Sequence, residues 1–65
     1  MGITGRDLVK FFQQEGWELD RIRGNHYVMV KEGFRSVPIP VHGNKDLPKS
    51  LTAAILKQAG LKENG

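Results

Sequence analysis

The sequence predicts a single α+β domain with two layers, in the order helix, three antiparallel strands, helix. Apolar residues recur at helical spacing near both ends of the chain, and they alternate with a period of two between residues 17 and 41. A chain of 65 residues has room for one hydrophobic core, and both helices would cover the apolar face of the sheet. We therefore expect one domain over residues 1–65, with the polar residues 62–65 as a frayed tail.

The first helix is predicted by a start signal, an apolar stripe and a stop signal. Thr4 is followed three residues later by Asp7, which is an aspartate variant of the capping box. The stripe at helical spacing consists of Leu8, Val9, Phe11 and Phe12. Gly16 offers the left-handed conformation that often ends a helix, so we expect the helix to run from Thr4 to about Glu15.

The middle of the chain predicts an antiparallel meander of three strands, with tight turns at the dipeptides "GN" and "EG". The first two strands would pair around the first turn, so that Arg23 faces His26. Ile22 and Tyr27 would then be the hydrogen-bonded pair nearest this turn, which leaves residues 23–26 as a four-residue loop.

The alternation also assigns side chains to the two faces of this sheet. The helix-covered face is expected to carry, from the three strands in turn, Trp17, Leu19, Arg21, Arg23, His26, Val28, Val30, Val37, Ile39 and Val41. Pro38 and Pro40 fall on the opposite face. Because proline cannot donate a hydrogen bond to a neighbouring strand, the third strand should lie at an edge of the sheet.

Several apolar residues are left on the uncovered face, where a monomer would gain nothing from burying them. They are Ile22, Tyr27, Met29 and Phe34. We interpret them as a partner surface, which self-association would use as well as another protein would.

The second helix is predicted after a polar loop that follows the third strand. Pro48 suits the first helical position, and Gly60 lies just past the expected end. Leu51, Ala54 and Ile55 would form its buried stripe.

Composition excludes several classes of function. The absence of cysteine rules out thiol nucleophiles and Cys-ligated zinc, and two histidines far apart in the sequence give little support to any metal site, so we expect no metal and no cofactor. No apolar run approaches the length of a membrane span or a signal-peptide core, which predicts a cytoplasmic protein without a membrane partner. Ten Lys and Arg against seven Asp and Glu give a net charge of +3, which fits an anionic partner such as nucleic acid.

The predicted topology brings both helix N-termini to the turn that precedes His26, because short connections make successive elements antiparallel. Each N-terminus presents unpaired backbone N–H groups and a partial positive charge, and therefore suits a phosphate. We expect phosphate or RNA to be bound at this end by Arg6, Arg23, Asn25, His42, Lys45 and Lys49. For His42 a structural or substrate-positioning role is preferred, with a second acid/base role as the alternative.

A basic cluster around one imidazole has what metal-free RNA cleavage requires. Histidine exchanges a proton near neutral pH, so His26 could assist attack by a ribose 2′-hydroxyl on the neighbouring phosphate, and DNA would be spared. Position in the sequence alone favours the simpler interpretation, in which His26 is a polar residue that begins a strand.

The stretch "GNHYVMV", followed by "VPIPVHGNKDLPKSLTAAILKQAGL", resembles the HicA, or YcfA-like, toxins of bacterial and archaeal HicAB toxin–antitoxin pairs. The likeness extends from "GRDLVKFFQQEGWELDR" through "LKQAGL". It implies a fold like that of double-stranded-RNA-binding domains, cleavage of mRNA, a catalytic role for His26 and a HicB-like antitoxin as partner. Asn25 stands where the family usually has Ser, and Ser50 where many members have Gly.

We therefore expect the toxin of a type II toxin–antitoxin system, acting as a metal-independent endoribonuclease through His26. The main alternative is a noncatalytic RNA-binding module that uses the same basic end, with salt-dependent binding and no cleavage products. A third hypothesis is an antitoxin-binding subunit that has lost its activity.

Overall fold

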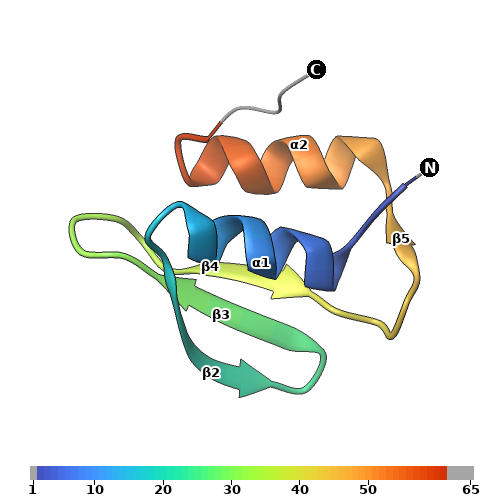
Figure 1. Ribbon diagram of the computed structural model, residues 1–65, viewed down its shortest axis with the longest axis horizontal. Helices are drawn as coiled ribbons and strands as arrows, with labels where there is room; N and C mark the ends of the chain where they lie inside the picture. Colours follow the sequence, from blue (N-terminus) through green and yellow to red (C-terminus); the bar gives the residue numbers. More distant parts are fainter. Residues whose placement is uncertain (1, 62–65) are drawn as a thin grey trace.

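The computed structural model describes residues 2–61 and contains two helices packed on antiparallel strands (Figure 1). This confirms the predicted α+β class. In chain order the elements are β1 (Ile3–Thr4), α1 (Gly5–Gln14), β2 (Glu18–Arg23), β3 (His26–Val30), β4 (Val37–Pro40), β5 (Asp46–Leu47) and α2 (Lys49–Gln58). The expected tail at residues 62–65 lies outside the described part of the chain.

Two short strands that the sequence did not predict hold the helix starts together. β1 pairs antiparallel with β5, so that Ile3 lies opposite Leu47 and Thr4 opposite Asp46. Since β1 leads directly into α1 and β5 precedes α2, this pairing brings the two helix N-termini to the same end of the domain (Figure 1).

Helix α1 begins and ends as predicted. The backbone N–H of Thr4 donates to Oδ2 of Asp7 over 3.0 Å, and the backbone N–H of Asp7 donates to Oγ1 of Thr4 over 3.1 Å, which completes the capping box. Glu15 is the C-terminal cap, and Gly16 follows with φ of 92°. Local signals alone therefore fix the limits of this helix.

The three-stranded sheet has the order β2–β3–β4, which confirms that β4 lies at an edge. Arg23 faces His26 and Ile22 faces Tyr27, as expected. The strands continue up to Arg23 and His26, so the connection is a two-residue turn instead of the predicted four-residue loop. Gly24 has φ of 57°, as the first central residue of a type II′ turn requires.

The side chains that β3 directs toward the helices are not those that the alternation predicted. Tyr27 lies opposite Ile39 and Met29 opposite Val37, so these residues share one face. Met29 and Ile39 are fully buried in the core. The helix-covered face therefore carries Tyr27 and Met29, and the assignment of Met29 to an uncovered face was wrong.

The opposite face of the sheet is the open one, and it carries the residues that the sequence placed inside. His26 lies opposite Pro40 and Val28 opposite Pro38. Arg23 and Arg21 share this face because they lie opposite His26 and Val28. The predicted faces are thus inverted for β3 and for the second half of β2, but correct for β4.

A β-bulge in β2 explains this inversion. Leu19 lies opposite Met29 and Arg21 opposite Val28, so that Asp20 is an extra residue between two adjacent pairs. If side chains alternated strictly through Asp20, Leu19 and Arg21 would lie on the same face of the sheet. The bulge shifts the alternation by one residue, so they lie on opposite faces.

The core lies between the sheet and the helices. Helix α1 contacts all three strands, and α2 contacts β4. The apolar residues of this core are Leu8, Val9, Phe12, Trp17, Met29, Val37, Ile39, Val41, Ile55, Leu56 and Ala59. None of the helices within residues 2–61 is long and apolar enough to cross a membrane.

Helix α2 differs from its prediction in two details. Pro48 is the N-terminal cap residue, one position before the helix, although Gly60 follows the end with φ of 70° as expected. Its buried helical residues are Thr52, Ile55 and Leu56, whereas Leu51 and Ala54 are exposed. The buried stripe is therefore rotated from the predicted one and includes a threonine.

Candidate functional site

His26 begins β3 and directs its imidazole to the open face of the sheet. Its ring is exposed, and Arg23 and Pro40 lie opposite it on the neighbouring strands. The type II′ turn at Gly24 brings Arg23 and His26 into this pairing, because it is compatible with the twist of the two strands. The imidazole is thus held beside a guanidinium by the shortest connection that a hairpin allows.

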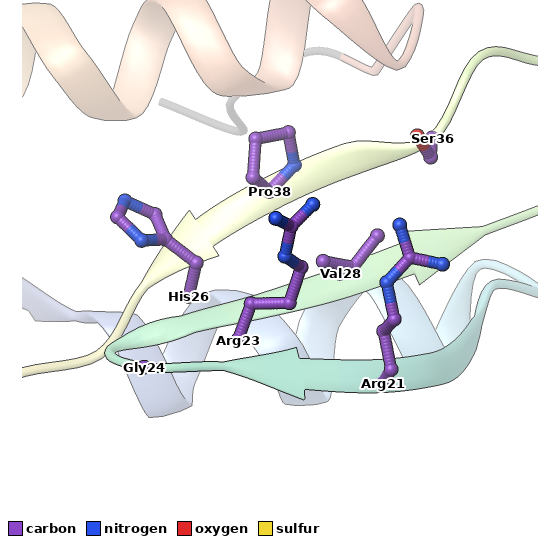
Figure 2. A pocket seen from close by; sticks show the side chains of 7 residues that line it. All are labelled: Arg21, Arg23, Gly24, His26, Val28, Ser36 and Pro38. Carbon is purple, nitrogen blue, oxygen red and sulfur yellow. The ribbon is translucent and has the colours of Figure 1, made fainter.

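The next row of side chains on this face consists of Arg21, Val28 and Pro38. Val28 is only 7% exposed although it is not part of the helix-side core. Figure 2 shows the side chains of Arg21 and Arg23 on the same side of the sheet as His26 and Val28. This row therefore places an apolar floor beside a second guanidinium.

These two rows enclose an open groove of about 670 Å³. Its lining consists of Arg21, Arg23, Gly24, His26, Val28, Ser36 and Pro38 (Figure 2). The groove therefore combines two permanent positive charges, one imidazole, one hydroxyl group and an apolar floor. Its size falls in the range of small-ligand sites, and its charge suits an anion.

No carboxylate lines the groove, but one lies next to it. Nη1 of Arg21 forms an ion pair with Oδ2 of Asp20 over 3.0 Å, and both side chains are largely exposed. Among the described residues, Arg23 has no such partner. The guanidinium of Arg23 is therefore the cation that an anion beside His26 would meet first.

The structure brings together only part of the predicted binding set. Arg23 and His26 line the groove, and Asn25 forms the adjoining turn, where its carbonyl oxygen accepts a hydrogen bond from the backbone N–H of Val41 over 2.7 Å. The remaining predicted binding residues are exposed but do not line the groove: Arg6, His42, Lys45 and Lys49.

The predicted convergence of the helix N-termini is confirmed only in part. Both helices begin at the end of the domain where His26 lies, and the start of α1 at Gly5 touches the carbonyl group of Pro40. The helices cover the other face of the sheet, however, so their N–H groups are separated by the sheet from the groove. Arginine side chains, and not helix ends, supply the positive charge around the imidazole.

The predicted partner surface does not form one surface. Met29 is buried, and Tyr27 is half-buried and packs against the core. Ile22 is 52% exposed on the helix side of β2, and Phe34 is 48% exposed in the loop after β3, where its ring lies 5.4 Å from that of Trp17. The shared uncovered face is therefore wrong for Tyr27 and Met29, because it depended on the inverted faces of β3, whereas a contact of Ile22 and Phe34 with a partner stays a prediction.

Sequence reasoning missed Arg21, Ser36 and the apolar floor. The predicted register placed Arg21 on the same face as Arg23 and His26, but it took that face as the helix-covered one, so Arg21 was not expected in a binding site. Ser36 precedes β4 and had no distinguishing neighbour in the sequence. Among residues 2–61, no three His, Asp or Glu side chains gather as a metal site would require.

Comparison with known proteins identifies a family. A family model described as the HicA toxin of bacterial toxin-antitoxin matches residues 5–61, which extend from the start of α1 to just beyond the end of α2. No curated protein matches the chain.

Proposed function

Because the chain belongs to the HicA toxin family of bacterial toxin–antitoxin systems, we propose that it is a metal-independent endoribonuclease that cleaves mRNA through His26. Toxins of this family are mRNA-cleaving ribonucleases, and the family implies an RNA substrate and a cognate antitoxin. We propose a HicB-like antitoxin as the inhibitor. The order of helix, three strands and helix supports an arrangement like that of double-stranded-RNA-binding domains.

The observation that carries this proposal is the exposed imidazole of His26 beside the guanidinium of Arg23, in a groove without a carboxylate. The ribose 2′-oxygen attacks the neighbouring phosphorus and the bond from phosphorus to the 5′-oxygen breaks, which yields a 2′,3′-cyclic phosphate and a 5′-hydroxyl end. His26 serves one of the two proton transfers, at the nucleophile or at the leaving oxygen, and water exchanges the other proton. Arg23 stabilises the charge that develops on the phosphoryl oxygens.

Other predicted residues have a secondary place in this proposal. Arg6, Lys45 and Lys49 are exposed cations on the helices and the loop before β5, and we assign them to flanking phosphates of a longer RNA. Asn25 shapes the turn that presents His26. We assign His42 a positioning role on the RNA, because it does not line the groove.

The deciding experiment compares the wild type with His26→Ala. Because His26 is exposed, the variant should keep its fold, which circular dichroism would check, while cleavage of RNA in EDTA falls by about 100-fold or more. Cleavage should leave a cyclic phosphate and should stop when the ribose at the cut carries no 2′-hydroxyl.

The other histidine of the chain offers a comparison. His42→Ala removes the same side chain from a position outside the groove, so it should weaken RNA binding but change the rate at saturating RNA by no more than a few fold. The proposal is wrong if His26→Ala cleaves as well as the wild type, or if EDTA abolishes the activity of the wild type.

One observation favours a noncatalytic RNA-binding module as the second candidate. The groove contains one histidine and no second acid/base side chain, whereas its two guanidinium groups are enough to bind phosphate. This candidate predicts salt-dependent RNA binding by the wild type, with the RNA intact after long incubation.

A further inference from the structure

We propose that the groove is a binding site for two consecutive phosphates of unpaired RNA, with the second phosphate at Arg21 and an acidic boundary at Glu18. This inference rests on the proposed function, because it takes RNA as the ligand. It adds a position one nucleotide away from the cleaved bond, where Arg21 is a positioning residue and does not touch the reacting atoms.

The spacing of the two arginines carries the first step. Arg23 and Arg21 lie two residues apart on the same face of β2, opposite His26 and Val28. Two residues of a β-strand span about 7 Å, which is similar to the separation of neighbouring phosphates along an extended RNA strand. A phosphate held by Arg23 beside His26 therefore leaves the next phosphate within reach of Arg21 (Figure 2).

The apolar floor between these positions favours an unpaired nucleotide. Val28 and Pro38 lie opposite each other in the row of Arg21, and they give the groove an apolar lining against which a ribose or a base can pack. A base can reach this surface only when it is not stacked inside a duplex. Ser36 contributes a hydroxyl group at the far end of the groove.

The ion pair between Arg21 and Asp20 weakens the second phosphate position but does not block it. The side chains of Arg21 and Asp20 are 59% and 44% exposed, and an exposed pair of this kind contributes little to stability. A guanidinium has five N–H donors, so several remain for a phosphate. Removing the neighbouring carboxylate by Asp20→Asn should therefore tighten binding.

A change in charge limits the site to two phosphates. The row beyond Arg21 pairs Glu18 with Val30, and a second hollow there is lined by Gly16, Glu18, Val30, Lys31 and Glu32. Its one cation, Lys31, already donates from Nζ to the carbonyl oxygen of Glu15 over 3.0 Å. A third phosphate would thus meet two carboxylates.

The experiment measures binding of short RNAs that cannot be cleaved because the reactive ribose lacks its 2′-hydroxyl. A dinucleotide, a trinucleotide and a tetranucleotide carry one, two and three internal phosphates, and NMR titration measures even weak binding. The added nucleotide is placed on the 5′ side in one series and on the 3′ side in another. In one of the two series the trinucleotide should bind about 10-fold more tightly than the dinucleotide. The slope of its log binding constant against log salt concentration should be about 0.7 larger. The tetranucleotide should bind no more than slightly more tightly than the trinucleotide.

The variant Arg21→Gln should reduce trinucleotide binding to the level of the dinucleotide and leave dinucleotide binding unchanged, whereas Arg21→Lys should restore the salt slope. Arg35→Gln is the matched control, because Arg35 is exposed and lies outside the groove. The inference is overturned if Arg21→Gln weakens both probes equally, if Arg35→Gln has the same effect, or if a duplex of equal length binds better.

The outcomes separate this inference from the proposed function. Cleavage that depends on His26, without any effect of Arg21 on the trinucleotide, would reject the second phosphate position alone. Length-dependent binding that requires Arg21, without cleavage of natural RNA, would support the position and reject the nuclease. Failure of every short probe to bind, with His26-dependent cleavage of natural RNA intact, would reject this inference alone, and the same failure without any cleavage would reject both.

Discussion

Replacing Gly5 by alanine should destabilise the protein and disturb the strand that faces His26. Gly5 is the first residue of α1, and a Cβ atom built on it would lie 2.1 Å from the carbonyl oxygen of Pro40 and 2.9 Å from Cα of Val41. All these neighbours are backbone atoms, so no side-chain rotation can relieve the contact. Real Cβ atoms essentially never approach a neighbour within 3.0 Å, so the start of α1 and β4 must separate by at least 0.9 Å, the difference between 3.0 and 2.1 Å.

Two opposing effects determine the size of this change. Alanine is a better helix former than glycine by about 1 kcal/mol, which favours the variant. Overpacking a close contact costs about 1–3 kcal/mol, and more where backbone must move. Because both sides of this contact are backbone, we expect the clash to win, with a net loss of about 1–2 kcal/mol in the free energy of unfolding. For a domain of this size that corresponds to a melting temperature lower by about 4–16 °C.

Thermal and urea denaturation followed by circular dichroism would measure this loss. Gln13→Ala, at an exposed position of α1, is the control for helix propensity and should be neutral or slightly stabilising. The backbone N–H of Val41, which donates to the carbonyl oxygen of Asn25, should change its NMR chemical shift in Gly5→Ala only. A variant as stable as the wild type, with an unchanged Val41 amide, would refute the reasoning.

Two further predictions concern single polar groups. Thr52 is 2% exposed, and its hydroxyl oxygen has no hydrogen-bond partner among the described residues. The nearly isosteric Thr52→Val should therefore raise the free energy of unfolding, measured in urea titrations, by about 1 kcal/mol. A variant less stable than the wild type would contradict this. Hydrogen bonds from the backbone N–H and the hydroxyl group of Thr4 lower the pKa of Asp7 below 3.8, so its stabilising effect is complete above this pH and is lost as the pH falls through the lowered pKa. Asp7→Asn should therefore be less stable than the wild type at pH 6, and the difference should shrink in acid; a difference that stays constant down to pH 2 would count against this explanation.

The parts of the fold that the sequence predicted correctly depend on short-range signals. The capping box of Thr4 and Asp7 and the stop at Gly16 fix α1 within the helix itself, and the pairing of Arg23 with His26 needs only a tight turn. Proline at positions 38 and 40 was enough to place β4 at an edge. Each of these predictions uses residues within a few positions of one another.

The parts that failed depend on contacts between distant segments. In β3 both alternating sets are apolar, Tyr27 and Met29 on one side and Val28 and Val30 on the other, so hydrophobicity alone does not choose the covered face. That choice is made by α1, which packs on Met29. The same choice decides whether His26 lies inside or on the open face, and the membership of the groove follows from it.

In α2 the rotation of the buried stripe has the same origin. Leu51 is more apolar than Thr52, but the position of the helix over β4 buries the threonine and leaves the leucine 38% exposed. Hydrophobic pattern sets only the average direction of a helix face, and packing against a neighbour sets the final angle.

The extra residue at Asp20 gives β2 a tolerance that its neighbours lack. On either side of it, Leu19 and Ile22 lie on the helix side of the sheet, and Glu18, Arg21 and Arg23 lie on the open side. A chain shortened by this one residue would regain regular alternation with every other side chain on its present side, whereas a deletion elsewhere in the strand would exchange inside for outside. Length variation in this strand among related chains should therefore concentrate at Asp20, because the loss of this residue leaves every other side chain on its present face.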